Sequence, residues 1–227
     1  MSKHGMVLGA SVSCFDLFNL ERQFEGIHQA PVDFMHFDVV DGRFNRCIIL
    51  GLPLLEAIRP HTTLPIEAHL AVYEPKHFIE QFVKAGADLV AVHPEGTDDI
   101  LGAFDLVRKY GAKPVLALRS ETDADETMLE AYRQAEYIIK LTVNPGFSGQ
   151  QIQPAAFLKM ANLRRMMDEH GIDTPICADG NVNAKTIPTL VQHGAGMLIG
   201  GTSGLFLKEK SVKECAQVML DAMQAQA

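Results

Sequence analysis

Short apolar runs alternate with amphipathic stretches along most of the chain. Each apolar run ends near a polar residue or glycine and is apolar nearly throughout, which is typical of parallel strands buried on both faces. The predicted strands cover residues 6–13, 34–40, 65–72, 89–95, 114–120, 137–143, 175–180 and 196–201. A predicted helix follows each run; after Asp16, for example, Leu17, Leu20 and Phe24 fall on one helical face.

This alternation predicts an α/β protein built as a (βα)8 TIM barrel. Eight strand–helix units within 227 residues match the size of that fold. A doubly wound open sheet is the alternative that the pattern leaves open. No linker, low-complexity tract or block of charge divides the chain, so we expect a single domain over residues 1–227.

Composition and charge exclude several classes of partner. The net charge is −8, and no basic cluster exceeds short pairs such as Arg164-Arg165, so we expect no nucleic-acid partner. No apolar run reaches the length of about 18 residues that a membrane span needs, and the first residues lack a signal-peptide pattern. The four cysteines are far apart and form no CxxC motif, which indicates reduced thiols and a cytoplasmic protein.

Two histidines and two aspartates stand at or near the ends of three predicted strands. His36 and Asp38 lie in FMHFDVVDG, His69 in PIEAHLAV and Asp179 in PICADGN. Alternate residues of a strand face the same side, so His36 and Asp38 point together. In a barrel these strand ends meet at one rim, where active sites form. Two imidazoles and two carboxylates are a plausible set of ligands for a divalent metal, and the carboxylates are also candidates for proton transfer.

Glycine-rich turns follow the last three predicted strands. They are NPGFSGQ at residues 144–150, Gly180-Asn181, and GGTSG at residues 200–204. Glycine lets backbone N–H groups approach an anion closely, and barrels often bind phosphate in the loops of their last strands. The three turns together predict a phosphate site on the rim that carries the histidines and aspartates.

Several motifs resemble the ribulose-phosphate 3-epimerase family. The segments ASVSCFDL, MHFDVVDGRF, HLAV, VNPGFSGQ, ADGN and GGTSGLF occur in the family's order and spacing over essentially the whole chain. The ending GTSGLF is more similar to the allulose-6-phosphate 3-epimerase branch. The resemblance implies one divalent metal ion, with zinc first and iron, manganese or cobalt as alternatives. It also implies a ketose phosphate as substrate and a homo-oligomer.

The resemblance assigns roles to individual residues. It implies His36, Asp38, His69 and Asp179 as metal ligands, with Asp38 and Asp179 also the catalytic acid and base. It implies that the substrate contacts Ser11, His69, Gly146, Phe147, Ser148, Gly149, Gly180, Asn181, Gly201 and Thr202. Epimerisation at C3 of a ketose removes a proton beside a carbonyl and needs one base on each face. We therefore predict metal-dependent 3-epimerisation of a ribulose 5-phosphate or allulose 6-phosphate type of substrate, by two-base transfer through an enediolate.

The sequence leaves the family pattern around these residues. In the family, methionine usually occupies the positions of Val40, Ala71 and Leu141. Arg46 and Arg119 also replace uncharged family residues near the rim. These changes indicate either neutral drift or a substrate other than ribulose 5-phosphate, with the arginines meeting a more anionic sugar phosphate. A catalytically altered sugar-phosphate-binding barrel and a metal-dependent aldolase on the same scaffold remain alternatives.

Three further polar residues lie in or just after apolar runs. We interpret His93 and Glu95, in LVAVHPE, as supporting or structural residues rather than metal ligands. Lys140 lies inside YIIKLTV, where a salt bridge or a side chain reaching the bottom of the barrel is expected rather than a Schiff-base lysine.

Overall fold

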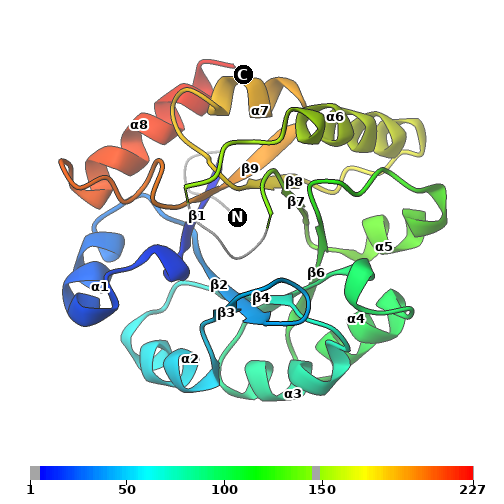
Figure 1. Ribbon diagram of the computed structural model, residues 1–227, viewed down its shortest axis with the longest axis horizontal. Coiled ribbons are helices and arrows are strands. Elements are labelled where there is room, and N and C mark those ends of the chain that lie inside the picture. The colour runs from blue at the N-terminus through cyan, green and yellow to red at the C-terminus, as the bar shows by residue number, and fades with distance from the viewer. Residues whose placement is uncertain (1–5, 145–148, 227) are drawn as a thin grey trace.

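The chain forms a closed parallel barrel surrounded by a ring of helices (Figure 1). The computed structural model describes residues 6–144 and 149–226. The first strand, β1 (Val7–Ser11), pairs in parallel with both β2 (Phe34–Asp41) and β9 (Ala195–Gly200), and these pairings close the barrel. The predicted TIM barrel is therefore confirmed.

The remaining elements follow the predicted alternation. The other barrel strands are β4 (Ile66–Ala71), β5 (Leu89–Val92), β6 (Lys113–Leu118), β7 (Ile138–Leu141) and β8 (Ile176–Asp179). The helices are α1 (Leu20–His28), α2 (Leu52–Ile58), α3 (Lys76–Lys84), α4 (Ile100–Lys109), α5 (Leu129–Gln134), α6 (Pro154–Glu169), α7 (Ile187–Gln192) and α8 (Val212–Gln224). Several strands end earlier than predicted; β5, for example, stops at Val92 because Pro94–Gly96 forms a 3-10 turn.

A short strand next to β2 was not predicted. The two residues of β3 (Ile48–Ile49) pair in antiparallel fashion with Val40 and Asp41 at the end of β2. The Asp41 carboxylate turns the chain there, because it accepts hydrogen bonds from the backbone N–H groups of Arg43 and Phe44. A two-residue strand is too short to leave a periodic pattern in the sequence.

Most buried apolar side chains of the described residues fall in two layers, with a small third cluster of Val40, Phe44 and Ala71. The larger layer lies between the strands and the helices, because strands that are apolar on both faces must be covered on both faces. The smaller layer fills the barrel interior and includes Phe34, Val115, Ile139 and Cys177. Gly9 gives Phe34 its space, because a Cβ at this position would lie 2.4 Å from the Phe34 ring. The interior is thus packed, and the space for a ligand lies above it, at the carboxyl ends of the strands.

Candidate active site

The two histidines and two aspartates converge as the sequence predicts. One ligand atom of each residue lies within 4.8 Å of those of the other three. The Asp38 Oδ1 atom is 2.9 Å from His36 Nε2 and 3.1 Å from His69 Nδ1, and Asp179 Oδ2 is 3.7 Å from His36 Nε2. Strand register explains part of this geometry, since Asp38 on β2 lies directly beside His69 on β4.

The donor set fits a divalent cation. Imidazole nitrogens and carboxylate oxygens suit borderline metals such as zinc, and the four donors are close enough to share one ion. Each histidine turns one specific ring nitrogen toward the Asp38 carboxylate. His36 presents Nε2 and His69 presents Nδ1, so each ring leaves its other nitrogen for a partner outside the set.

The two aspartates of the set have opposite pKa shifts. Burial acts to raise the pKa of Asp38, but the charge and hydrogen bond of His36 outweigh it and hold the pKa well below its usual range. Burial raises the pKa of Asp179 to about 6, although His36 opposes that shift. Two neighbouring carboxyl groups with separated pKa values are what acid and base roles in one reaction require.

Each histidine of the set is supported from outside. The Nδ1 atom of His36 is 2.9 Å from Glu67 Oε2, and the Nε2 atom of His69 is 2.8 Å from His93 Nε2. His93 in turn has its Nδ1 atom 3.2 Å from Glu95 Oε2. His93 and Glu95 thus lie outside the ligand set, and His93 contacts His69, in agreement with the supporting role interpreted from the sequence.

Two contributors were missed in the sequence. The Ser13 hydroxyl donates to Asp38 Oδ2 at 2.8 Å, beside the longer 3.2 Å hydrogen bond from Ser11. Glu67 lies two residues before His69 on β4 and therefore faces the same side. The two-residue period that pairs His36 with Asp38 was a sufficient signal for Glu67.

A cavity of about 380 Å³ opens at the carboxyl ends of the strands, beside the ligand set. All predicted substrate-contacting residues that the structure describes line it: Ser11, His69, Gly149, Gly180, Asn181, Gly201 and Thr202. Gly146, Phe147 and Ser148 lie outside the described residues. The catalytic candidates Asp38 and Asp179 line the same cavity. Three of the four predicted metal ligands, Asp38, His69 and Asp179, thus share one cavity with the described phosphate candidates, while His36 is buried behind them.

The turn after β8 requires its glycine. Gly180 has a φ of 113°, and a Cβ there would lie 2.6 Å from Val143 Cγ2. Its carbonyl accepts a hydrogen bond from Thr142 Oγ1 at 2.5 Å. Asn181 follows with a φ of 48°, a left-handed conformation that asparagine tolerates better than most residues. The backbone at 180–181 is thereby fixed against the cavity.

The positions that depart from the family pattern lie in different places. Leu141 lines the cavity, whereas Val40 and Ala71 are buried against Phe44 beside it. Neither Arg46 nor Arg119 lines the cavity.

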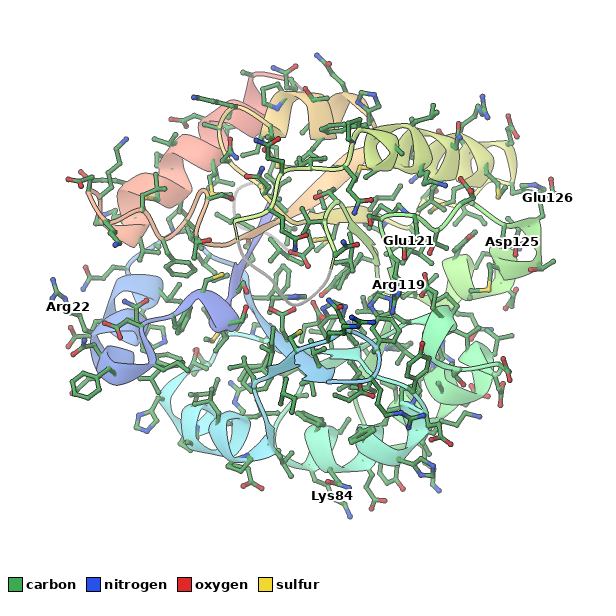
Figure 2. All side chains as sticks on the ribbon, viewed as in Figure 1. Arg22, Lys84, Arg119, Glu121, Asp125 and Glu126 are labelled. Carbon is green, nitrogen blue, oxygen red and sulfur yellow. The ribbon has the colours of Figure 1, made fainter. Side chains whose placement is uncertain are left out.

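Arg119 is engaged elsewhere on the rim. Its guanidinium lies 4.0 Å from the Phe44 ring centroid and donates to the Phe44 carbonyl, with Glu121 close by (Figure 2). The idea that Arg119 meets the sugar phosphate therefore has no support in the structure.

Lys140 corrects a further expectation. Its ammonium group forms no salt bridge with a described residue and does not reach the bottom of the barrel. It donates to the backbone carbonyls of Arg119 and Thr122, at 2.5 and 2.6 Å, just beyond the carboxyl end of β6. A long side chain on β7 thus fixes the adjacent loop, a contact that the sequence pattern does not reveal.

The chain is similar in sequence to known proteins. The sequence profile of the ribulose-phosphate 3 epimerase family matches residues 7–206. Ribulose-phosphate 3-epimerase of Bacillus subtilis is 32% identical over 207 residues, which cover 90% of this chain and 95% of that protein. The enzyme of the same name from Methanocaldococcus jannaschii is 33% identical over 222 residues, covering 95% of this chain and 92% of its own.

Solved structures show the same fold at lower identity. A crystal structure of 3-hexulose-6-phosphate synthase covers 96% of this chain and 100% of its own, with a TM-score of 0.67 and 19% identity. Within the described residues, no helix is both long and apolar enough to span a membrane. The match of the family profile to residues 7–206 and the identity above 30% to full-length relatives lead to one conclusion: the chain belongs to the ribulose-phosphate 3-epimerase family.

Proposed function

We propose that this protein is a metal-dependent 3-epimerase of a phosphorylated ketose, of the ribulose 5-phosphate or allulose 6-phosphate type. The observation that carries the proposal is the pair Asp38 and Asp179, which line one cavity and have opposite pKa shifts. A reversible inversion at C3 needs two such groups, one to take a proton and one to give a proton to the opposite face.

The residues divide the work as follows. Asp38, ionised and held by the hydroxyls of Ser11 and Ser13, takes the proton from C3 in one direction. Asp179 retains a proton closer to neutral pH and delivers it to the other face, and the reverse reaction exchanges the two roles. A divalent cation held by His36, Asp38, His69 and Asp179, when bound, supplies positive charge that stabilises an enediolate. We propose zinc, with iron(II), manganese and cobalt as alternatives that metal analysis separates.

The glycine-rich side of the cavity is proposed to hold the phosphate. Gly149, Gly180-Asn181 and Gly201-Thr202 line the cavity, and the three glycines place no side chain between their backbone and a ligand. The motif GTSGLF at residues 201–206 favours a substrate of the allulose 6-phosphate type, while the names of the relatives favour ribulose 5-phosphate.

Deuterium exchange at C3 tests the reaction. Purified, metal-analysed protein is incubated in D₂O with ribulose 5-phosphate, allulose 6-phosphate and related ketose phosphates. We expect exchange and epimerisation with one of them, and loss of both in Asp38→Asn and Asp179→Asn. Asp41→Asn is the matched control, because Asp41 also ends β2 but its carboxylate binds the backbone of the following turn.

Other outcomes would favour the alternatives. Products of carbon–carbon cleavage would indicate an aldolase, and ligand binding without exchange would indicate a catalytically altered binding barrel. If Asp38→Asn and Asp179→Asn exchange C3 hydrogen like the parent protein, the two-base mechanism is wrong.

We further propose that the protein is a homo-oligomer. Support comes from two exposed apolar side chains: Ile48, which lines the cavity, is 84% exposed, and Phe18, which follows the lining residue Leu17 in the chain, is 96% exposed. Large apolar side chains exposed to this extent are typical of interaction surfaces. Light scattering coupled to size-exclusion chromatography measures the mass directly, and a monomer would refute this proposal.

A further inference from the structure

A carboxylate lies completely buried beneath the ligand set. Glu67 on β4 has no exposed surface, and it lies directly beside His36 of β2, which is also fully buried. Tyr137, which immediately precedes β7, is 6% exposed and belongs to the apolar interior of the barrel, with its ring centroid 5.9 Å from that of Phe34. An ionisable carboxyl group in such surroundings costs stability unless its partners compensate.

One oxygen of this carboxylate makes both hydrogen bonds that the structure describes. Glu67 Oε2 lies 2.9 Å from His36 Nδ1 and 3.1 Å from the Tyr137 hydroxyl. The second oxygen, Oε1, is buried and has no hydrogen-bond partner among the described residues. Tyr137 donates to Glu67, so the hydroxyl holds the carboxylate on the side of His36.

This arrangement fixes the tautomer of a metal-ligating histidine. An ionised carboxylate only accepts hydrogen bonds, so His36 Nδ1 carries the proton that points to Glu67. A cation that binds His36 would therefore use Nε2, the atom that lies 2.9 Å from Asp38 Oδ1 and 3.7 Å from Asp179 Oδ2, while Nδ1 keeps its proton. The proton on Nδ1 therefore leaves His36 ready to bind a cation within the set.

We propose that Glu67, held in place by Tyr137, is a positioning residue that raises the affinity of this site for a divalent cation. The inference rests on the metal site of the proposed function and adds two residues outside the four ligands. Glu67 acts in two ways: it orients the His36 ring, and it places a third carboxyl group, fully buried, close to the half-buried Asp38 and Asp179. Both effects make His36 a stronger ligand.

Metal affinity of the folded protein is the direct test. Metal-free protein is titrated with Zn²⁺ and with Co²⁺ in competition with a chromophoric chelator, and the Co²⁺ absorption spectrum is recorded. We expect Glu67→Gln to weaken binding by about 10- to 100-fold and to change the Co²⁺ spectrum, although circular dichroism shows a folded protein. The glutamine side chain keeps the shape of glutamate but lacks its charge, so the loss is assigned to the charge.

A pair of tyrosine variants provides a second measurement. Tyr137→Phe removes the hydroxyl that holds Glu67, and we expect a smaller loss of affinity in the same direction. Tyr132→Phe is the matched control: Tyr132 is also buried, but its hydroxyl accepts a hydrogen bond from the Asp125 backbone on the outer side of the barrel. We expect Tyr132→Phe to bind both metals like the parent protein. The tyrosine pair decides the question if Glu67→Gln does not fold.

The outcomes separate the inference from the proposed function. If the parent protein binds no divalent cation, the proposed metal site is wrong and the inference falls with it. If the parent protein binds the cation and Glu67→Gln binds it equally tightly with an unchanged Co²⁺ spectrum, only the inference is wrong. Where Glu67→Gln does not fold, the same result for Tyr137→Phe leads to the same conclusion. Weaker binding in a protein without epimerase activity would support the positioning role and refute the proposed reaction.

Discussion

Gly180→Ala is expected to damage the phosphate side of the cavity far more than an equivalent change elsewhere. The added Cβ would lie 2.6 Å from Val143 Cγ2 and 2.8 Å from Thr142 Oγ1. Ordinary van der Waals contact begins near 3.4 Å, so the backbone must shift by about 0.8 Å to relieve the closer contact. A shift of this size exceeds the tolerance of a hydrogen bond between a backbone N–H group and a phosphate oxygen.

The size of the effect follows from that shift. A hydrogen bond to a charged group contributes about 1.5–3 kcal/mol, and each 1.4 kcal/mol is about tenfold in affinity. We therefore expect the KM of Gly180→Ala for its sugar phosphate to rise about 10- to 100-fold. Its free energy of unfolding should fall by about 1–2 kcal/mol for the positive φ, with about 1–3 kcal/mol more for the overpacking.

Gly111→Ala is the matched control for this experiment. Gly111 also has a positive φ, 95°, but a Cβ there meets nothing within 4 Å, and the residue follows α4 away from the cavity. We expect a loss of about 1–2 kcal/mol from the backbone strain and an unchanged KM. Urea unfolding and steady-state kinetics measure both quantities. Equal KM values for the two variants would refute the reasoning that Gly180 fixes a phosphate-binding backbone.

Three further predictions concern side chains beside the site. Burial acts to raise the pKa of Glu95, but hydrogen bonds from His93 and Thr122 outweigh it and lower the pKa to about 2, so the unfolded chain binds more protons at acid pH. In urea unfolding at pH 7, the free energy of unfolding of the parent protein should exceed that of Glu95→Gln by about 3 kcal/mol, and this difference should shrink as the pH falls from 4.5 to 2. A difference that does not change with pH would contradict this prediction. Lys140→Met leaves two carbonyls without their donor and should cost about 1–3 kcal/mol of stability with unchanged metal affinity; a stability equal to the parent's would show that these contacts contribute nothing. Ala71→Met adds volume at a buried site packed against Val40 and Phe44 and should destabilise by about 1–3 kcal/mol in thermal unfolding. Leu141→Met nearly conserves volume beside the cavity and should cost less; the reverse order would refute this assignment of the two positions.

The fold was accessible from the sequence because its signal is repeated. Each apolar run, such as residues 34–40, is followed by an amphipathic stretch, and the number of units determines the closed barrel. The exact ends of the strands were less accessible, since a strand end depends on the last ladder hydrogen bond. The short strand β3 was not predicted for a related reason. Its position depends on the turn that the Asp41 carboxylate stabilises, and two residues show no periodic pattern.

The candidate site was predicted in part. His36 and Asp38 are connected by the two-residue period, but the contact between Asp38 and His69 depends on strand register, which the sequence does not specify. Arg119 illustrates the limit more clearly. Its position near the rim suggested a ligand contact, yet a flexible side chain can turn to a neighbouring ring, and the structure places it over Phe44.

Barrel closure also has a consequence for the order of assembly. The proposed ligands His36, Asp38 and His69 come from neighbouring strands near the start of the chain, whereas the fourth, Asp179, lies on β8, which reaches β2 through β9 and β1. A growing or partly unfolded chain therefore holds a three-donor site until the ring is complete. A cation that needs all four donors stabilises the complete ring over every open form. Its release should consequently accompany the first opening of the ring, and metal loss becomes an early marker of unfolding.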